Sequence, residues 1–240
     1  MSGRGVPHGA RAAARGALVV FAKAPRAGEV KTRMCPPLSH AEAAELYANM
    51  LADVLEASAS AAARLGLAPV LAVHPPELCA ALAQDAPTPF CVVPQRGRDL
   101  AQRMAWAVRE CAAGGSSRVL LRGSDSPTLD ASALASALAR LDAHDVVLRP
   151  DLDGGYNLVG LRAPDAAIFE HPMSTARVLE DTAARARALG LRVAIEDAGF
   201  DLDRIEDLGS LARARNGAAG LCPRTLAYAD ARDLWRHVPR

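Results

Sequence analysis

The sequence predicts an α/β fold in which helices cover both faces of a mainly parallel sheet. The apolar run at residues 17–22 lacks polar alternation, which is typical of a strand buried on both faces. From there to about residue 150, short apolar runs alternate with longer segments of helical periodicity, which is the order that βαβ units require. With 240 residues, half of them hydrophobic, the chain is long enough to build one such core.

Capping residues place the helices of the first half. Ser39 and Glu42 form a capping-box pattern that predicts a helix over residues 40–64, and Gly66 predicts its end. Asp99 and Asp130 are N-cap residues for two later helices. The expected strands are 17–22, 68–74, 90–93, 118–122 and 145–148, and the expected helices are 40–64, 75–82, 99–111 and 130–141.

After residue 150 the pattern is less regular, but no repeat or linker divides the chain. We therefore expect one domain over residues 16–240. Residues 1–15 carry Arg and Gly without an apolar stretch, so we expect a disordered extension and not a signal peptide. The expected elements are strands over 156–161 and 191–195, helices over 174–189 and 205–213, and a final helix within 217–240.

The composition excludes several classes of protein. A net charge of +1 argues against a broad nucleic-acid surface, which would need many unpaired Lys and Arg on one face. No stretch is apolar and long enough to span a membrane. The five cysteines are odd in number and form no Cys-x-x-Cys pair, so we expect neither a disulfide framework nor a zinc site, and we expect a cytoplasmic protein. The sequence does not determine the oligomeric state.

A basic loop follows the first strand. Gly28 lets its backbone turn closely, and Lys23, Lys31 and Arg33 can converge on a polyanion such as a diphosphate. The loop is not a P-loop, because the Gly-Lys-Ser/Thr ending is absent. A solvated basic loop without a ligand is the alternative.

Asp125 follows the strand at 118–122 and stands two residues after Gly123. A carboxylate at a strand end is suited to Mg²⁺ or Mn²⁺, which prefer hard oxygen ligands and bridge phosphate oxygens. Asp203 is a candidate second metal ligand. The alternatives are that Asp125 begins a turn helped by Pro127, and that Asp203 caps the next helix.

Two further segments follow strands. Asp153 is a candidate to contact a sugar or to act as general base, Tyr156 can stack or hydrogen-bond, and Gly154 and Gly155 allow a ligand to approach. A hairpin turn is the alternative, since Asp-Gly and Gly-Gly are hairpin signals. The start of the helix at residue 99 offers an anion site, for which plain capping is the alternative; its candidate residues are Gln95, Asp99 and Arg103.

Together these segments resemble the radical-SAM/selenodomain-associated transferase 1 family, which is GT-A-like and is also described as an arsenosugar-biosynthesis-type glycosyltransferase. The resemblance covers about residues 17–208, and its motifs are residues 21–25 with 31–33, 95–104, 123–127, 153–156 and 203–208. It implies a Rossmann-like GT-A sandwich of the nucleotide-diphospho-sugar transferase superfamily. It also implies that Ser174 and Thr175 bind substrate.

The chain departs from the family pattern at four positions. Ser126 stands where the family often has Cys, Asn157 where it has a second Tyr, Met173 where it usually has Trp, and Ala101 where it often has Gly. The Trp position implies a contribution to the acceptor pocket, so its loss bears on the acceptor. The metal and phosphate positions are intact.

Three functions compete. The first is metal-dependent glycosyl transfer from a nucleotide sugar to a small-molecule acceptor. The second is guanylyltransferase-like nucleotidyl transfer from a nucleoside triphosphate, since such enzymes share the sheet, the basic loop and the metal-binding Asp. The third is a nucleotide-binding module without activity. Release of a nucleoside diphosphate indicates the first, and release of pyrophosphate indicates the second.

Overall fold

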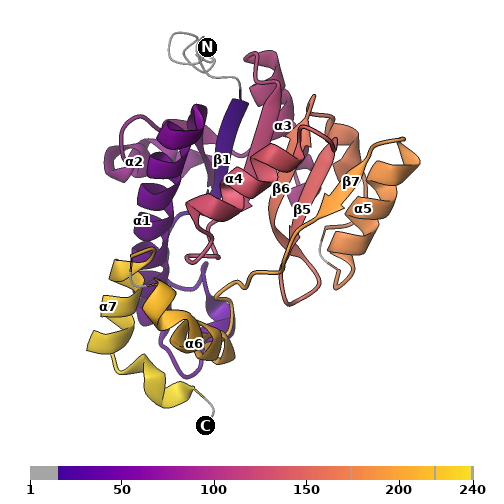
Figure 1. Ribbon diagram of the computed structural model, residues 1–240. Coiled ribbons are helices and arrows are strands. Elements are labelled where there is room, and N and C mark those ends of the chain that lie inside the picture. The colour runs from indigo at the N-terminus through magenta and orange to yellow at the C-terminus, as the bar shows by residue number, and fades with distance from the viewer. Residues whose placement is uncertain (1–15, 174, 219, 239–240) are drawn as a thin grey trace.

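The computed structural model describes residues 16–173, 175–218 and 220–238, so the extension expected over residues 1–15 lies outside the described part. Its centre is a seven-stranded sheet with the order β3-β2-β1-β4-β6-β5-β7 (Figure 1). The strands are β1 (Gly16–Lys23), β2 (Leu67–His74), β3 (Cys91–Pro94), β4 (Arg118–Gly123), β5 (Val146–Pro150), β6 (Tyr156–Arg162) and β7 (Val193–Ile195). The expected α/β class is confirmed.

Three helices of the first half begin directly after the expected N-cap residues Ser39, Asp99 and Asp130, whereas the helix expected over residues 75–82 is a 3-10 turn followed by an α-helix that ends at Asp85. Ser39 accepts a hydrogen bond from the Glu42 backbone, the Glu42 carboxylate accepts one from the Ser39 backbone, and Gly66 ends the helix in the left-handed conformation. The α-helices are α1 (His40–Leu65), α2 (Cys79–Asp85), α3 (Leu100–Ala113), α4 (Ala131–Arg140), α5 (Val178–Ala188), α6 (Leu208–Ala218) and α7 (Pro223–Ala231). The 3-10 helices are η1 (Thr32–Met34), η2 (Pro76–Leu78), η3 (Ala166–Phe169), η4 (Ile205–Asp207) and η5 (Leu234–His237).

Helices cover both faces of the sheet, as expected. Residues of α3, α5 and η3 are buried with one set of strand side chains, and residues of α1 and α4 with the other. Across the described ranges, no helix is both long and apolar enough to cross a membrane. That residues 16–240 form a single domain stays a prediction.

One strand runs against the others. The turn at residues 151–155 returns the chain beside β5, so β6 is antiparallel to both β5 and β4, while the other neighbouring strands pair in parallel. The hairpin alternative for this segment is therefore correct. As a result, the first residues of β6 lie at the same edge of the sheet as the carboxyl ends of β1, β4 and β5.

Two expectations for the second half are wrong in their boundaries. The helix expected from residue 174 begins at Val178, because Ala176 packs on the β5–β6 turn, where its backbone oxygen lies against Gly154. Ser174 itself lies outside the described residues. The tail contains more than one helix, since Pro223 starts α7 after a break and Trp235 lies in η5.

Asp53 of α1 joins this tail to the body of the protein. Its carboxylate is buried and accepts hydrogen bonds from the Thr225 backbone and hydroxyl, both at 2.8 Å, and from the Arg224 backbone at 3.2 Å. Because the N-cap residue Cys222 makes no side-chain cap, Asp53 supplies the acceptor for the N-terminus of α7 from a distant helix.

We expect Asp53→Ala to lower the free energy of unfolding by about 2–4 kcal/mol, because buried donors of Thr225 lose a charged acceptor. Asp53→Asn keeps one acceptor oxygen and should cost less. Urea denaturation followed by circular dichroism measures both. A loss below about 0.5 kcal/mol in Asp53→Ala, the range of ordinary surface changes, would contradict the anchoring role.

Candidate functional site

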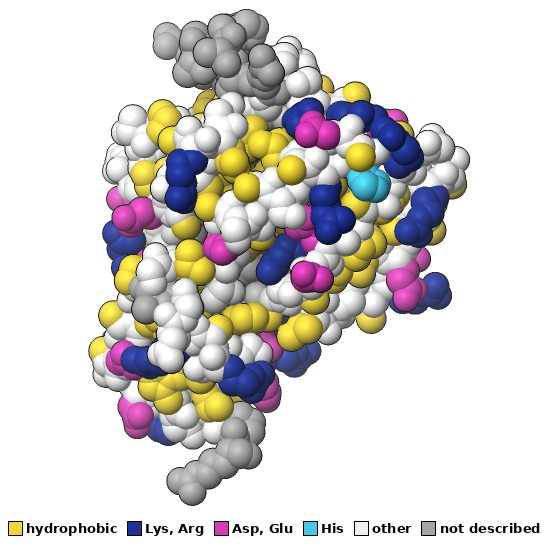
Figure 2. Space-filling view, viewed as in Figure 1, with side chains coloured by type: hydrophobic (Ala, Val, Ile, Leu, Met, Phe, Trp, Pro, Cys, Tyr) yellow, Lys and Arg dark blue, Asp and Glu magenta, His cyan; other side chains and the backbone are white. Residues whose placement is uncertain are grey.

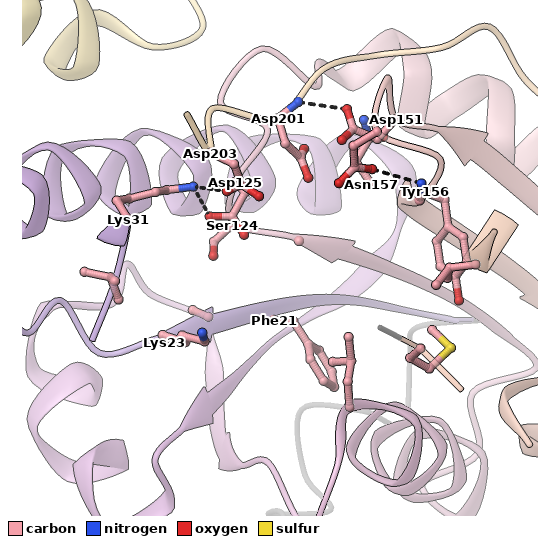
Figure 3. A pocket seen from close by; sticks show the side chains of 18 of the residues that line it. Phe21, Lys23, Lys31, Ser124, Asp125, Asp151, Tyr156, Asn157, Asp201 and Asp203 are labelled. Atoms are coloured by element: carbon pink, nitrogen blue, oxygen red, sulfur yellow. Dashed lines mark hydrogen bonds and ion pairs between the residues drawn. The ribbon is translucent and has the colours of Figure 1, made fainter. Parts of the chain in front are cut away.

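A cleft of about 910 Å³ opens at the carboxyl edge of the parallel strands (Figure 3). Its walls come from β1 and β4, from the loops after β1, β3, β4 and β5, and from the segment after β7. The structure brings most of the expected site residues together here, namely Lys23, Lys31, Arg33, Gln95, Arg103, Asp125, Asp153, Gly155, Tyr156, Thr175 and Asp203. On the outer face shown in Figure 2, basic side chains lie among acidic ones.

Lys31 is buried between the two expected metal ligands. Its ammonium group forms ion pairs with Asp125 and, at 2.8 Å, with Asp203. Burial lowers the pKa of Lys31, but the two carboxylates outweigh it and raise the pKa above its ordinary value. The same ammonium group holds the pKa of Asp203 below its ordinary value against the effect of burial. The residue expected to bind phosphate thus offsets one of the two negative charges of the acidic pair in this structure.

A hydrogen-bonded chain fixes the loop that carries Asp125. The Tyr47 hydroxyl of α1 lies 2.8 Å from the Ser124 hydroxyl and accepts from the Lys23 backbone at 2.9 Å. The Tyr47 ring also lies 5.7 Å from the Lys31 ammonium group, within cation–π range. The sequence did not single out Tyr47 or Ser124, because Tyr47 falls among the apolar residues of α1.

The buried side chain of Arg122 also stabilises the loop that carries Asp125. Its guanidinium group is buried and donates to the backbone oxygens of Gly123, Ser126 and Leu129, the Ser126 contact being 2.6 Å. Burial lowers the pKa of Arg122 to about 10, which leaves it charged at neutral pH. In the sequence the signal for this role is weak, because it consists of one charged residue at the end of an apolar strand.

A second pair of acidic residues, Asp151 and Asp201, lies deeper in the cleft than Asp153, the candidate general base. The Asp201 backbone donates to Asp151 at 2.9 Å, and the Ser126 hydroxyl donates to the Asp201 carboxylate. Burial raises the pKa of Asp201 to about 8 and, with the nearby Asp153, that of Asp151 to about 6. By contrast Asp153 is exposed, and its carboxylate accepts from the Gly155 backbone at 2.9 Å, which shapes the turn.

Tyr156 presents its ring to the cleft, whereas its hydroxyl points into the protein. The hydroxyl accepts a long hydrogen bond of 3.4 Å from Thr182, which also lies 2.8 Å from His171. Burial raises the pKa of Tyr156 above its ordinary value. The hydroxyl is therefore placed to support packing against α5, and the ring is the part that a ligand can contact.

Three other residues expected at the site, Asp99, Gly154 and Gly28, have roles in helix capping or backbone conformation. Asp99 caps α3 by accepting from the Gln102 backbone at 2.8 Å and lies outside the cleft, so the capping alternative describes it correctly. Gly154 has φ +91°, and a Cβ there would lie 2.1 Å from Ala176 O, so this glycine allows protein to approach, not a ligand. Gly28 has φ +81° with open space around it and does not line the cleft.

Gln95 is fixed at the cleft wall. Its amide nitrogen donates to the backbone oxygens of Ala22 and Ala72 at 3.1 and 2.9 Å, and the residue is buried. Arg103 donates to Asp99 O at 3.2 Å and lines the same wall. The side of the cleft near β1 and α3 therefore carries Lys23 and Arg103, while the side near β5 and β6 carries Asp151 and Asp153.

Comparison with known proteins relates this cleft to transferases. A family model described as an uncharacterized protein conserved in bacteria (DUF2064) matches residues 56–175. The 3-phospho-D-glycerate guanylyltransferase of Phenylobacterium zucineum (strain HLK1) is 35% identical over 213 residues, which cover 86% of this chain and 93% of that enzyme.

Solved structures share the fold. A protein from Desulfovibrio desulfuricans G20 that has been assigned as a nucleotide-diphospho-sugar transferase is 27% identical, with a TM-score of 0.82 over 95% of this chain and 100% of its own. The 4-diphosphocytidyl-2C-methyl-D-erythritol synthase of Anaerococcus prevotii DSM 20548 is 10% identical, with a TM-score of 0.54 over 84% of this chain and 99% of its own, and shows a likeness of fold alone.

Fold and cleft thus define an enzyme of the transferase class with the Rossmann-like fold of the nucleotide-diphospho-sugar transferases. Within that class, the chain belongs to the DUF2064 family. Membership of the radical-SAM-associated subfamily stays a prediction.

We expect Asp151→Asn to stabilise the protein at neutral pH. The raised pKa of about 6 means that the folded state holds the proton more tightly than the unfolded state, whose Asp has a pKa of 3.8. Ionisation of Asp151 therefore lowers the free energy of unfolding as the pH rises from about 4 to about 6. Above that range the loss is constant. Thermal denaturation should show a gain for the variant that is absent near pH 3.5 and largest above about pH 6. A gain independent of pH would contradict this assignment.

Proposed function

We propose that the protein is a nucleotidyltransferase that moves a guanylyl group from GTP to a small phosphorylated hydroxy acid and releases pyrophosphate. The observation that carries the proposal is the 35% identity to a 3-phospho-D-glycerate guanylyltransferase over 86% of this chain. This identity favours nucleotidyl transfer, the second function considered from the sequence, over the expected glycosyl transfer. Glycosyl transfer remains the second candidate because of the 27% identical structure assigned as a nucleotide-diphospho-sugar transferase.

The charges of the cleft support the transfer of one anion to another. Lys23, Arg33, Arg103 and Arg204 line it and supply positive charge for a triphosphate and for an anionic acceptor. In the reaction, a phosphate oxygen of the acceptor attacks the α-phosphorus of GTP. The bond between the α- and β-phosphates breaks, and pyrophosphate leaves with the electron pair. Because the attacking phosphate is already ionised at neutral pH, no general base is required.

Asp125 and Asp203 suit a divalent cation. Their carboxylates already converge on one positively charged group, the Lys31 ammonium. Within the described residues, no cluster of three or more His, Cys, Asp or Glu side chains could hold a metal ion by itself. Mg²⁺ commonly binds through one or two protein carboxylates together with substrate phosphates, so the pair fits Mg²⁺ or Mn²⁺ that arrives with a nucleotide. When bound, the ion neutralises charge on the triphosphate and on the departing pyrophosphate.

Product analysis tests the proposal. Purified protein with Mg²⁺, GTP and 3-phospho-D-glycerate should release pyrophosphate and form a guanylylated product, and both should require the acceptor. ATP, CTP and UTP serve as base controls. Asp125→Asn should abolish turnover, and circular dichroism at the assay temperature should show that the variant is still folded, because Asp203 still pairs with Lys31. Release of a nucleoside diphosphate from a nucleotide sugar, without pyrophosphate from any triphosphate, would support glycosyl transfer instead.

Lys31→Met should increase the affinity for Mn²⁺ in the absence of nucleotide. In the wild type a cation must displace the Lys31 ammonium group from both carboxylates, which costs about 1–2 kcal/mol, or about tenfold in affinity. Electron paramagnetic resonance of free Mn²⁺ measures the binding. Lys23→Met is the control, because Lys23 lines the cleft without an ion pair to Asp125 or Asp203. Equal or weaker Mn²⁺ binding by Lys31→Met would contradict this role.

A further inference from the structure

Asn157 lies at an irregularity of the sheet. β5 pairs Arg149 with Leu158 and Pro150 with Tyr156, so Asn157 is the extra residue of a β-bulge in β6. A bulge turns a side chain away from the regular alternation, and bulges recur beside active sites. Asn157 is only 2% exposed, yet it lines the cleft at its β5–β6 side.

The two ends of the Asn157 amide have different surroundings. Its oxygen accepts from the Arg149 guanidinium group at 3.0 Å, which sets the amide orientation because arginine is only a donor. Its nitrogen is buried and has no hydrogen-bond partner. Leaving such a donor unpaired costs about 1–3 kcal/mol, so the fold keeps an unused buried donor in a residue that lines the cleft.

The Arg149 guanidinium group lies beside a glycine. A Cβ on Gly199 would be 1.8 Å from an Arg149 guanidinium nitrogen, so the glycine leaves this position open for the guanidinium group. A larger residue at position 199 would require the end of the Arg149 side chain to move, and with it the donor that orients the Asn157 amide.

The neighbouring cleft residues are acceptors. Asp151 and Asp201 line the same side, where Figure 3 draws them together with Asn157, away from Lys23 and Phe21. A hydroxyl group both donates and accepts a hydrogen bond. A carboxylate that accepts its proton and an amide nitrogen that donates to its oxygen together satisfy both needs of the hydroxyl group.

We propose that Asn157 is a specificity-determining residue that donates from its amide nitrogen to a hydroxyl oxygen of the acceptor, while Asp151 accepts the proton of that hydroxyl. Arg149 is a positioning residue for the amide. The inference rests on the proposed function and deepens it: the acceptor carries a free hydroxyl group next to its phosphorylated arm. Ribose hydroxyls of the nucleotide are the other source of this chemistry, and the basic residues that suit the triphosphate lie on the opposite side of the cleft.

Calorimetric binding of two probes tests the inference without needing turnover. The probes are 3-phospho-D-glycerate and 3-(phosphonooxy)propionate, which is the same phosphate ester without the hydroxyl group. The binding of each probe is measured in the presence of a GTP analogue and Mg²⁺. The wild type should bind the hydroxylated probe at least about tenfold more tightly, since a site that hydrogen-bonds a hydroxyl disfavours the analogue without it. Asn157→Asp keeps the shape and the acceptor for Arg149 but loses the donor, and it should bring the ratio near one. Asn157→Ala should do the same.

Asn49→Asp is the matched control, because Asn49 is on α1 outside the cleft and should leave the ratio unchanged. Equal binding of both probes by the wild type, or no binding of either, would overturn the inference even if pyrophosphate is released with another acceptor. A loss of preference for GTP over 2′-deoxy-GTP or 3′-deoxy-GTP in the Asn157 variants would also overturn it, since it would assign the donor to the ribose. Absence of pyrophosphate release, with the binding preference intact, would count against the proposed function alone.

Discussion

The ion pairs of Lys31 bring three distant segments of the chain to one point. Lys31 follows β1, Asp125 follows β4, and Asp203 lies beyond β7, and their charged groups meet at one ammonium nitrogen. The Lys31 side chain is 3% exposed, whereas those of Asp125 and Asp203 are 39% and 36% exposed, so the cation is enclosed and the carboxylates face the cleft. Removal of one partner from a buried pair leaves an uncompensated charge, which makes the geometry of the cleft dependent on this contact.

Charge in the cleft is separated although the chain is nearly neutral. Net charge reports a sum, and the sum of +1 conceals a basic side near β1 and an acidic side near β5. The acidic side is buried more deeply than its exposed turn suggests, because Asp201 is only partly exposed and is hydrogen-bonded to Ser126. Such an arrangement places opposite local potentials within one cavity, which suits a reaction that brings a polyanion and a hydroxylated partner together.

Local signals were sufficient for most of the fold and for much of the cleft. The ends of α1 follow from Ser39, Glu42 and Gly66, and strand ends placed Lys23 and Asp125 at one edge, because these features depend on neighbours in sequence. Features that depend on pairing between distant segments were not predictable. The Asn157 bulge arises from the register of β5 against β6, and Tyr47 resembles any other apolar residue of α1 until Ser124 is seen beside it. The turn at residues 151–155 leaves Asp153 exposed and half-buries Asp151, and this difference depends on the contact with Asp201, which the local sequence does not show.

The contact between Asp53 and α7 also has a consequence for the order of events during synthesis. Asp53 and Arg224 are 171 positions apart, so α1 is made long before its partner exists. Until residues 224 and 225 have left the ribosome, the Asp53 carboxylate has no backbone donors from α7 and must stay in contact with water. The surface of α1 that surrounds it is closed only when the last helices arrive, which makes completion of the tail the step that seals this side of the molecule.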